Sequence, residues 1–177
     1  MYDVNDDEFS EMYTTQEKGE NKLTSAISPK DPLEKLTQEK FILLNENSTL
    51  RETIDSIQTH HVGCVLLEKE GNLSGIFTER DIVQKVVGNR HDLETELVSK
   101  YMTKNPDSLH LQDPIAFALN KMISGEYRHI PIVDNSGKPT GVIAMQDIIN
   151  HLGDHFFDDI VNLPPNPIKS QEHREGG

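Results

Sequence analysis

The feature of this 177-residue chain that most constrains its fold is an internal repeat. The sequence HVGCVLLEKEGNLSGIFTERDIV, which starts at His61, aligns without a gap with YRHIPIVDNSGKPTGVIAMQDII, which starts at Tyr127, so the offset is 66. Upstream of these segments the offset becomes 65, and one residue is therefore inserted in the second copy near Gly125. Only two copies with so long a period predict a duplicated domain rather than a solenoid array.

Each copy predicts the same order of elements. Apolar residues recur at helical spacing at positions 50, 54 and 57, and again at 115, 119 and 122. A strand-length apolar run follows, then a glycine-containing turn, and then a second strand that leads into a helix. Short apolar runs at 41–44 and 108–111 predict one more strand before each copy. The expected fold class is α/β (α+β), with two β-α-β-β-α units packed as a pseudo-twofold pair, because a unit of about 60 residues is marginal alone.

Composition divides the chain into four parts. The first 20 residues carry seven acidic residues and one basic residue with no apolar period, which predicts a disordered acidic tail. We place this tail at residues 1–32, the first unit at 33–99 and the second unit at 100–153. Residues 154–177 are expected to extend the last helix and then to form a Pro-rich tail.

The overall charge argues against a nucleic-acid-binding protein. The chain has 30 acidic and 17 basic residues, which gives a formal charge of −13. Proteins that grip nucleic-acid backbones usually carry a basic surface, and this chain has no Trp and only 6% aromatic residues for base stacking. No nucleic-acid partner is expected.

The sequence also predicts a cytoplasmic protein without a membrane segment. No run approaches the roughly 20 apolar residues that a bilayer-crossing helix needs, and the acidic N-terminus is unlike a secretory signal. The single cysteine, Cys64, excludes an intramolecular disulfide and a multi-cysteine zinc site.

The repeated fragments resemble the cystathionine β-synthase (CBS) domain, which occurs in tandem pairs. The resemblance covers about residues 36–152 and leaves both tails outside. It rests on the fragments TLRETI at 49–54, GIFTERDI at 75–82, MTKNP at 102–106, RHIPIV at 128–133, DNSGK at 134–138 and GVIAMQDI at 141–148. Because two ungapped copies carry matching fragments in the same order, the chain is identified as a tandem CBS pair.

The resemblance implies two clefts between the copies that bind an adenosine-type ligand, such as AMP, ADP, ATP or S-adenosylmethionine, and thereby regulate another protein. A carboxylate at a helix start, Asp81 or Asp147, can accept hydrogen bonds from both ribose hydroxyls. The Thr78 hydroxyl lies where a helix N-terminus favours a phosphate, and Arg80 can pair with that phosphate. Apolar strand edges are expected to enclose the base, at Val62, Cys64, Ile130 and Pro131.

The two copies differ at the helix start. The first copy has Thr-Glu-Arg-Asp, whereas the second has Ala-Met-Gln-Asp and lacks the hydroxyl and the arginine. The pocket beside Asp147 is therefore expected to borrow Thr103 and Lys104 from its lead-in and Arg128 or His129 from its strand. The first copy has His60–His61 at the matching place, so its cationic charge there would depend on pH. At least one working site is expected.

Plainer structural roles compete with each of these assignments. Asp81 and Asp147 can be ordinary helix caps, and Cys64 fits a buried structural thiol. His60–His61 fit loop or edge positions, because adjacent residues on a strand point to opposite faces. His151 and His155 share a helix face at a spacing that can hold zinc, but a solvated face is favoured. No catalytic residue, no metal site and no cofactor apart from the regulatory nucleotide is expected.

Three functions remain open at this point. The first is a sensor that responds to an adenine nucleotide and signals to an unidentified target protein. The second is a structural or interaction module that has lost ligand binding, and the third, more distant, is a metalloenzyme that uses His151 and His155.

The sequence also predicts a homodimer. The last helix carries an apolar stripe longer than one unit can cover, at Ile148, Leu152, Phe156, Ile160 and Leu163. In the competing arrangement, residues 24–36 fold back and cover this stripe within one chain.

Overall fold

A computed structural model describes residue 28 and residues 30–36 and 40–161; for residues 154–161 it describes the helix but not the side chains. The first unit contains β1 (Leu43–Asn45), α2 (Leu50–His60), β2 (Cys64–Lys69), β3 (Asn72–Thr78), α3 (Glu79–Asp81) and a π-helical turn (Ile82–Val86). The second unit contains α4 (Ile115–Gly125), β5 (His129–Val133), β6 (Pro139–Ala144) and α5 (Met145–Val161). The remaining short elements are 3₁₀ turns at Leu33–Lys35 and Val98–Lys100 and the strand β4 (Thr103–Lys104).

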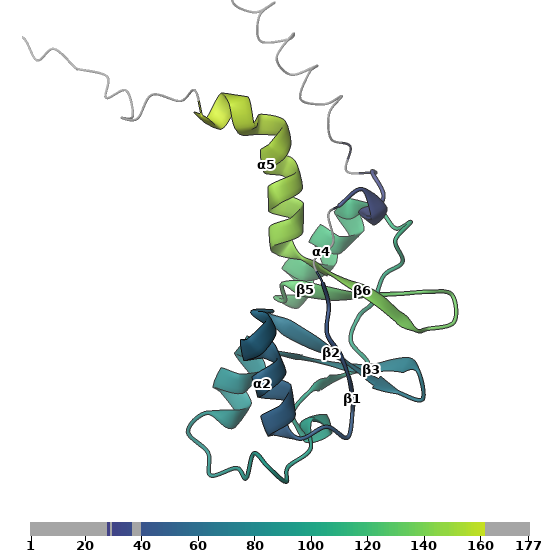
Figure 1. Ribbon diagram of the computed structural model, residues 1–177. Coiled ribbons are helices and arrows are strands. Elements are labelled where there is room, and N and C mark those ends of the chain that lie inside the picture. Colours follow the sequence, from purple (N-terminus) through teal and green to yellow (C-terminus); the bar gives the residue numbers. More distant parts are fainter. Residues whose placement is uncertain (1–27, 29, 37–39, 162–177) are drawn as a thin grey trace, which may run out of the picture.

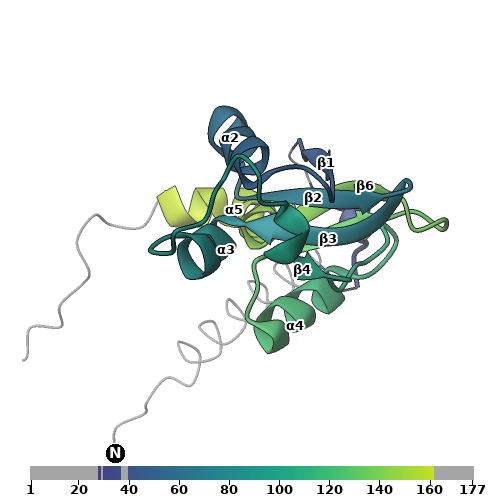
Figure 2. The same cartoon turned by 90° about the horizontal axis from the view of Figure 1, so that it is seen from below.

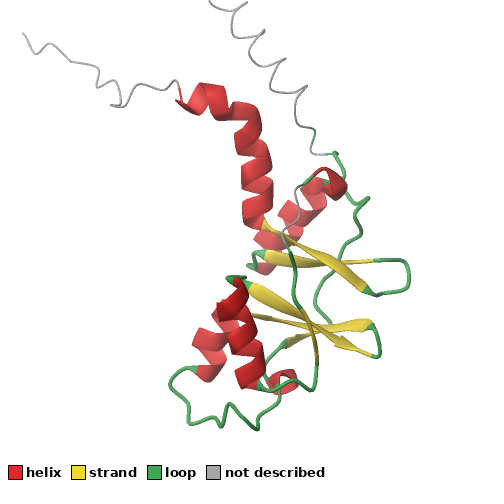
Figure 3. Ribbon diagram, viewed as in Figure 1, coloured by secondary structure: helices red, strands yellow, loops and turns green. Residues whose placement is uncertain are grey.

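Two sheets stack between the helices (Figure 1, Figure 3). The first has the order β1-β2-β3-β4, in which β1 runs parallel to β2 and the other neighbours are antiparallel. The second is the antiparallel pair β5-β6. Seen from below, α2 and α4 lie on opposite sides of the strands (Figure 2). The α+β class and the duplication are confirmed, but the strand expected at 108–111 is reduced to a single parallel bridge between Leu109 and Ile132.

The matching helices of the two units begin differently and end alike. α2 starts with a capping box, in which Thr49 and Glu52 each bind the other's backbone N–H. α4 starts after Pro114 and has no such cap. Both helices end on a left-handed residue, His61 with φ 54° and Glu126 with φ 55°.

This ending corrects the strand positions considered for the two histidines. His60 is the last residue of α2 and His61 is its C-cap, so they belong to a helix terminus and not to a strand. The helix persists to this point because its apolar positions, ending at Ile57, remain in the core.

The strand β2 is buried on both faces and joins two parts of the core. Val65 and Leu67 pack with Phe77 and the helices of the first unit. Their neighbours Cys64 and Leu66 face the other way and pack with Val142 of the second sheet. Burial on both faces explains why the first four residues of this strand, Cys64 to Leu67, are continuously apolar rather than alternating.

Each unit is completed by the segment that precedes the other. The 3₁₀ turn Leu33–Lys35 was assigned to the first unit from the sequence, but it comes before β1 and lies beside α4 of the second unit (Figure 1). The Leu33 N–H donates to the Asp113 carbonyl at 2.9 Å, and Leu33 and Leu36 are buried in the core of the second unit. In return Val98 and Met102, which come before α4 of the second unit, are buried in the core of the first.

This exchange bears on the competing arrangements considered for the last helix. Ile148 is fully buried and Leu152 partly buried in the cluster that contains Leu33 and Leu36. Part of the segment 24–36 therefore packs in the same core as the start of the apolar stripe on the last helix. The side chains of Phe156 and Ile160 and the whole of Leu163 lie outside the described residues, as do the acidic tail up to residue 27 and the Pro-rich end. In the described part of the chain, no helix combines the length and the apolar character needed to cross a bilayer.

Candidate ligand-binding site

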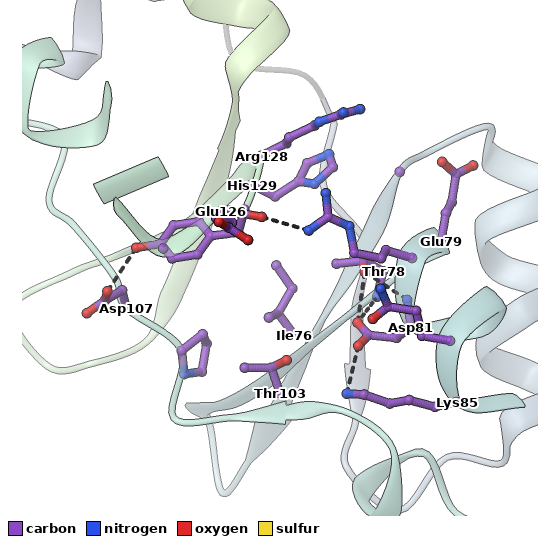
Figure 4. Close-up of a pocket in the computed structure, with 16 residues that line it drawn as sticks. Ile76, Thr78, Glu79, Asp81, Lys85, Thr103, Asp107, Glu126, Arg128 and His129 are labelled. Carbon is purple, nitrogen blue, oxygen red and sulfur yellow. Dashed lines mark hydrogen bonds and ion pairs between the residues drawn. The ribbon is translucent and has the colours of Figure 1, made fainter. Parts of the chain in front are cut away.

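A cavity of about 470 Å³ lies where the two units meet, and its size is typical of sites for small molecules. The first unit contributes the end of β3, α3 and the π-helical turn, while the second contributes the segment between α4 and β5 (Figure 4). The lining residues are Gly63, Ile76, Thr78, Glu79, Arg80, Asp81, Gln84, Lys85, Thr103, Pro106, Asp107, Gly125, Glu126, Tyr127, Arg128 and His129.

The centre of the site is the turn from β3 into α3. Thr78 is the N-cap residue, and the Asp81 Oδ2 accepts hydrogen bonds from the Thr78 N–H at 2.9 Å and from the Thr78 hydroxyl at 2.8 Å. This capping box turns the carboxylate of Asp81 back toward the strand, which leaves it only 7% exposed. The capping role and the position in the cavity therefore coincide in the same residues.

The other oxygen of this carboxylate is held by a lysine. The Lys85 Nζ lies 2.7 Å from the Asp81 Oδ1 and donates to the Tyr101 carbonyl at 2.6 Å. A carboxylate offers about four acceptor positions, and three are taken by these donors. One acceptor position remains for a ligand hydroxyl, whereas the sequence predicted that this carboxylate accepts from both ribose hydroxyls.

An arginine crosses the cavity from one unit to the other. The Arg80 Nη1 donates to the Glu126 carbonyl at 2.7 Å, which is the dashed line that ends at Glu126 in Figure 4. That carbonyl belongs to the left-handed residue that ends α4, so it is not used within the helix. Arg80 is exposed, and its guanidinium keeps further N–H groups for an anion.

The opposite wall is built around Tyr127. Its hydroxyl donates to the Asp107 Oδ2 at 2.8 Å, and Lys121 holds the other oxygen of Asp107 at 3.0 Å. The hydrogen bond from Tyr127, helped by Lys121, lowers the pKa of Asp107, and burial with the same bond raises the pKa of Tyr127 to about 12. The ring covers Gly125, where an added Cβ would lie 2.1 Å from a ring carbon. The Tyr127 ring thus forms an aromatic side of the cavity, and its hydrogen bond to the charged Asp107 carboxylate holds it in place.

Six of the twelve predicted site residues line the cavity, and they come together in an unexpected combination. Thr78, Arg80 and Asp81 are joined by Thr103, Arg128 and His129, which were expected beside Asp147. Thr103 lies here because β4 pairs with β3, with Thr103 opposite Ile76, so this segment belongs to the first sheet. Arg128 and His129 line this cavity and also border the turn capped by Asp147, since His129 pairs with Ala144.

The other six predicted residues do not line this cavity: Val62, Cys64, Lys104, Ile130, Pro131 and Asp147. Ile130 is fully buried in the core of the second unit. Cys64 is buried between the sheets, and burial raises the pKa of its thiol to about 12, as expected of a structural cysteine.

Asp147 repeats the capping arrangement of Asp81 in the second unit. Its Oδ2 accepts from the Ala144 N–H at 2.6 Å, and the residue is 5% exposed. The position that corresponds to Lys85 at the offset of 66 is His151. The local fold is thus the same, but the side chains around the carboxylate differ.

Sequence reasoning missed several lining residues because they act only in combination. Lys85, Asp107 and Tyr127 stand in three different segments, and no sequence motif marks them. For Lys85 the spacing was a usable signal, since it lies one helical turn after Asp81 and shares its face.

No metal centre is found in the described part of the chain, where no group of three or more His, Cys, Asp or Glu side chains could hold an ion. The pair considered for zinc cannot be placed, because the side chain of His155 lies outside the described residues.

These observations define a class of protein: a duplicated α+β pair with a polar cavity at the joint between the copies. The CBS domain family matches residues 27–88 and 98–154, and the chain belongs to this family. The CBS domain-containing protein CBSCBSPB5 of Arabidopsis thaliana is 40% identical over 117 residues, which cover 65% of this chain and 20% of that relative. The chain thus spans about a fifth of this relative's length.

Solved structures agree on the fold. A CBS domain protein from Pyrobaculum aerophilum, complexed with AMP, has a TM-score of 0.61 and 24% identity, and the match covers 70% of this chain and 98% of that one. The CBS domain pair of protein MJ0100, in complex with 5′-methylthioadenosine and S-adenosyl-L-methionine, has a TM-score of 0.62 and 22% identity, with 70% and 96% covered.

Proposed function

We propose that this chain is a regulatory module, not an enzyme, that binds an adenosine-type ligand in the cavity beside Asp81. The observation that carries the proposal is one cavity that is lined by the Thr78–Asp81 capping box of the first unit and by Tyr127 and Arg128 of the second. Asp81 offers an acceptor for a ribose hydroxyl, and Arg80 with Thr78 offers donors for a phosphate. Tyr127 offers a flat face for a base.

The charges of the cavity favour AMP over ATP. Asp81 and Asp107 are each paired with a lysine, at 2.7 Å and 3.0 Å. Arg80 and Arg128 are the arginines at the site, and two carboxylates at Glu79 and Glu126 offset part of their charge. A monophosphate carries about two negative charges, which these arginines can balance, whereas the longer phosphate chain of ATP brings additional charge next to the carboxylates.

Isothermal titration calorimetry with adenosine, AMP, ADP, ATP and S-adenosylmethionine tests the proposal. We expect AMP to bind more tightly than ATP, and Asp81→Asn to weaken adenosine and AMP alike. Asp147→Asn makes the same change in the other unit, so loss of binding in that variant alone would show that the ligand binds beside Asp147 and not beside Asp81. The absence of binding below about millimolar for every ligand would refute the proposal, whereas selective binding of S-adenosylmethionine would replace the nucleotide as the ligand.

The competing function is a structural or interaction module without a ligand. It is favoured by the second unit, where Ala144 replaces the capping hydroxyl and Gln146 replaces the arginine. A thermal-melt screen separates the two functions, because a ligand at ~100 times its dissociation constant adds about 2.7 kcal/mol of stability.

We also propose that the chain forms a homodimer through its helices and signals to a target protein. Large apolar side chains are exposed on α4, on α5 and in or directly after the π-helical turn, at Val83, Val87, Phe117, Ile123 and Ile149. Exposed apolar side chains gathered on helices favour a contact surface. A cytoplasmic location remains a prediction from the sequence.

A further inference from the structure

We propose that Lys85 is a positioning residue, which fixes the carboxylate of Asp81 for the ligand and does not itself hold the phosphate. This inference rests on the proposed function, since it names the residue that prepares the site for a ribose. It starts from the fact that Lys85 lines the cavity but has both of its contacts within the protein.

The local helix geometry brings Lys85 to Asp81. After α3 the chain continues as a π-helical turn over Ile82–Val86, an irregularity that is frequent at functional sites. Lys85 follows Asp81 by four residues, and the Nζ lies 2.7 Å from the Asp81 Oδ1. Thr78 holds the other oxygen from the opposite side. The two contacts together fix both the rotation and the tilt of the carboxylate.

A second contact keeps Lys85 itself in place. Its Nζ donates to the Tyr101 carbonyl at 2.6 Å, in the segment between the two units. The Tyr101 hydroxyl is bound in turn by Glu96 and by His91, whose ring meets the tyrosine edge-on at 4.9 Å. A lysine anchored at two points loses little freedom when a ligand arrives, which is the advantage of a preorganised site.

The alternative is that Lys85 leaves Asp81 and binds the ligand phosphate directly. The two arrangements predict different patterns for adenosine and AMP, because only AMP carries a phosphate. If Lys85 positions Asp81, Lys85→Met weakens adenosine and AMP equally, by about 10-fold. If it binds the phosphate, only AMP is affected.

Calorimetry on the full chain should therefore measure the affinities for adenosine and AMP, for Lys85→Met alone and combined with Asp81→Asn. We expect the Lys85→Met loss to disappear in the Asp81→Asn background, because the carboxylate it positions is gone. Lys138→Met is the matched control, a lysine in the turn between β5 and β6 that does not line the cavity. A loss confined to AMP, or an equal loss in both backgrounds, would overturn the inference.

A readout without ligand separates this inference from the proposed function. The Thr78 amide donates to the Asp81 carboxylate, and the Ala144 amide makes the matching bond to Asp147. Lys85→Met should speed hydrogen exchange at the Thr78 amide by about 10-fold and leave the Ala144 amide unchanged.

If the wild-type chain binds neither ligand, the proposed function fails, and the two amides alone decide whether Lys85 positions Asp81. Unchanged exchange at Thr78 overturns the positioning role whatever the ligand result.

Discussion

At the residue scale, Arg80 is the side chain that reports on a ligand phosphate. Arg80→Ala should weaken AMP by about 10-fold and adenosine much less, because only AMP supplies an anionic partner for the guanidinium. Calorimetry with both ligands measures the difference. Arg90→Ala is a suitable control, since Arg90 is exposed and lies outside the cavity. Equal losses of affinity for the two ligands would show that Arg80 does not bind the phosphate.

Asp107 links the same site to acid stability. Its pKa is lowered from 3.8 by the hydrogen bond from Tyr127 and by Lys121, so folding favours the charged carboxylate. The resulting stability is fully present above the unfolded-state pKa and is lost as the pH falls through the lowered folded-state pKa. Asp107→Asn should therefore reduce the loss of stability below about pH 4, as measured by urea unfolding at several pH values. An unchanged pH dependence would show that this group contributes nothing.

At the level of single residues, the sequence identified the turn from β3 into α3 but not all the residues that line the cavity. Thr78, Arg80 and Asp81 were predictable because they form one short motif in a recognisable repeat. Arg128 and His129 were expected beside Asp147, and their place in the cavity beside Asp81 was not predicted. Sequence spacing describes distances along one chain segment, whereas the cavity depends on which sheet β4 joins. Only the pairing of Thr103 with Ile76 decides that question.

At the scale of the element, β3 needs a glycine where the lead-in crosses it. A Cβ on Gly75 would lie 2.3 Å from the Met102 sulfur, and the thioether is itself packed in the first core. Gly75→Ala should therefore lower the unfolding free energy by about 1–3 kcal/mol. Urea denaturation measures this change. A loss below about 0.5 kcal/mol would mean that Met102 moves aside easily.

Gly153 provides the opposite case within α5. Nothing lies within 4 Å of a Cβ added there, and the residue is helical. Gly153→Ala should raise stability by about 0.5–1 kcal/mol, because alanine has less backbone freedom to lose in a helix. A decrease in thermal-denaturation experiments would indicate a contact made by this face of α5 in the assembled protein.

The elements themselves were largely predictable. The periodicity at Leu50, Ile54 and Ile57 corresponds to α2, whose capping box begins at Thr49. The strand at 108–111 was overpredicted, because an apolar run of that length fits a single bridge as well as a ladder. The histidines at the end of α2 were misplaced, since a left-handed C-cap leaves no periodic signal.

At the scale of the whole molecule, the proposed dimer is tested at an exposed helix position. Ile123 on α4 is 70% exposed, so Ile123→Asp adds a charge without disturbing the core. Light scattering should give about twice the 20.0 kDa chain mass for the wild type and a shift toward monomer for the variant. A chain truncated after Gly153 shows whether the rest of α5 is needed. A wild-type monomer at micromolar concentration would end the dimer proposal.

The exchanged lead-ins have a consequence for how such a chain can arise. The first core requires Val98 and Met102, and the second requires Leu33 and Leu36, so one repeat taken alone lacks two core residues of its own unit. Two separate copies of a single repeat can reach the same arrangement by trading these segments, as in a domain-swapped dimer. Gene duplication that joins them end to end replaces an encounter between molecules with a tethered one at high effective concentration. The joined copies then diverge independently, and one copy can keep the arginine before its helix-start aspartate while the other copy loses it.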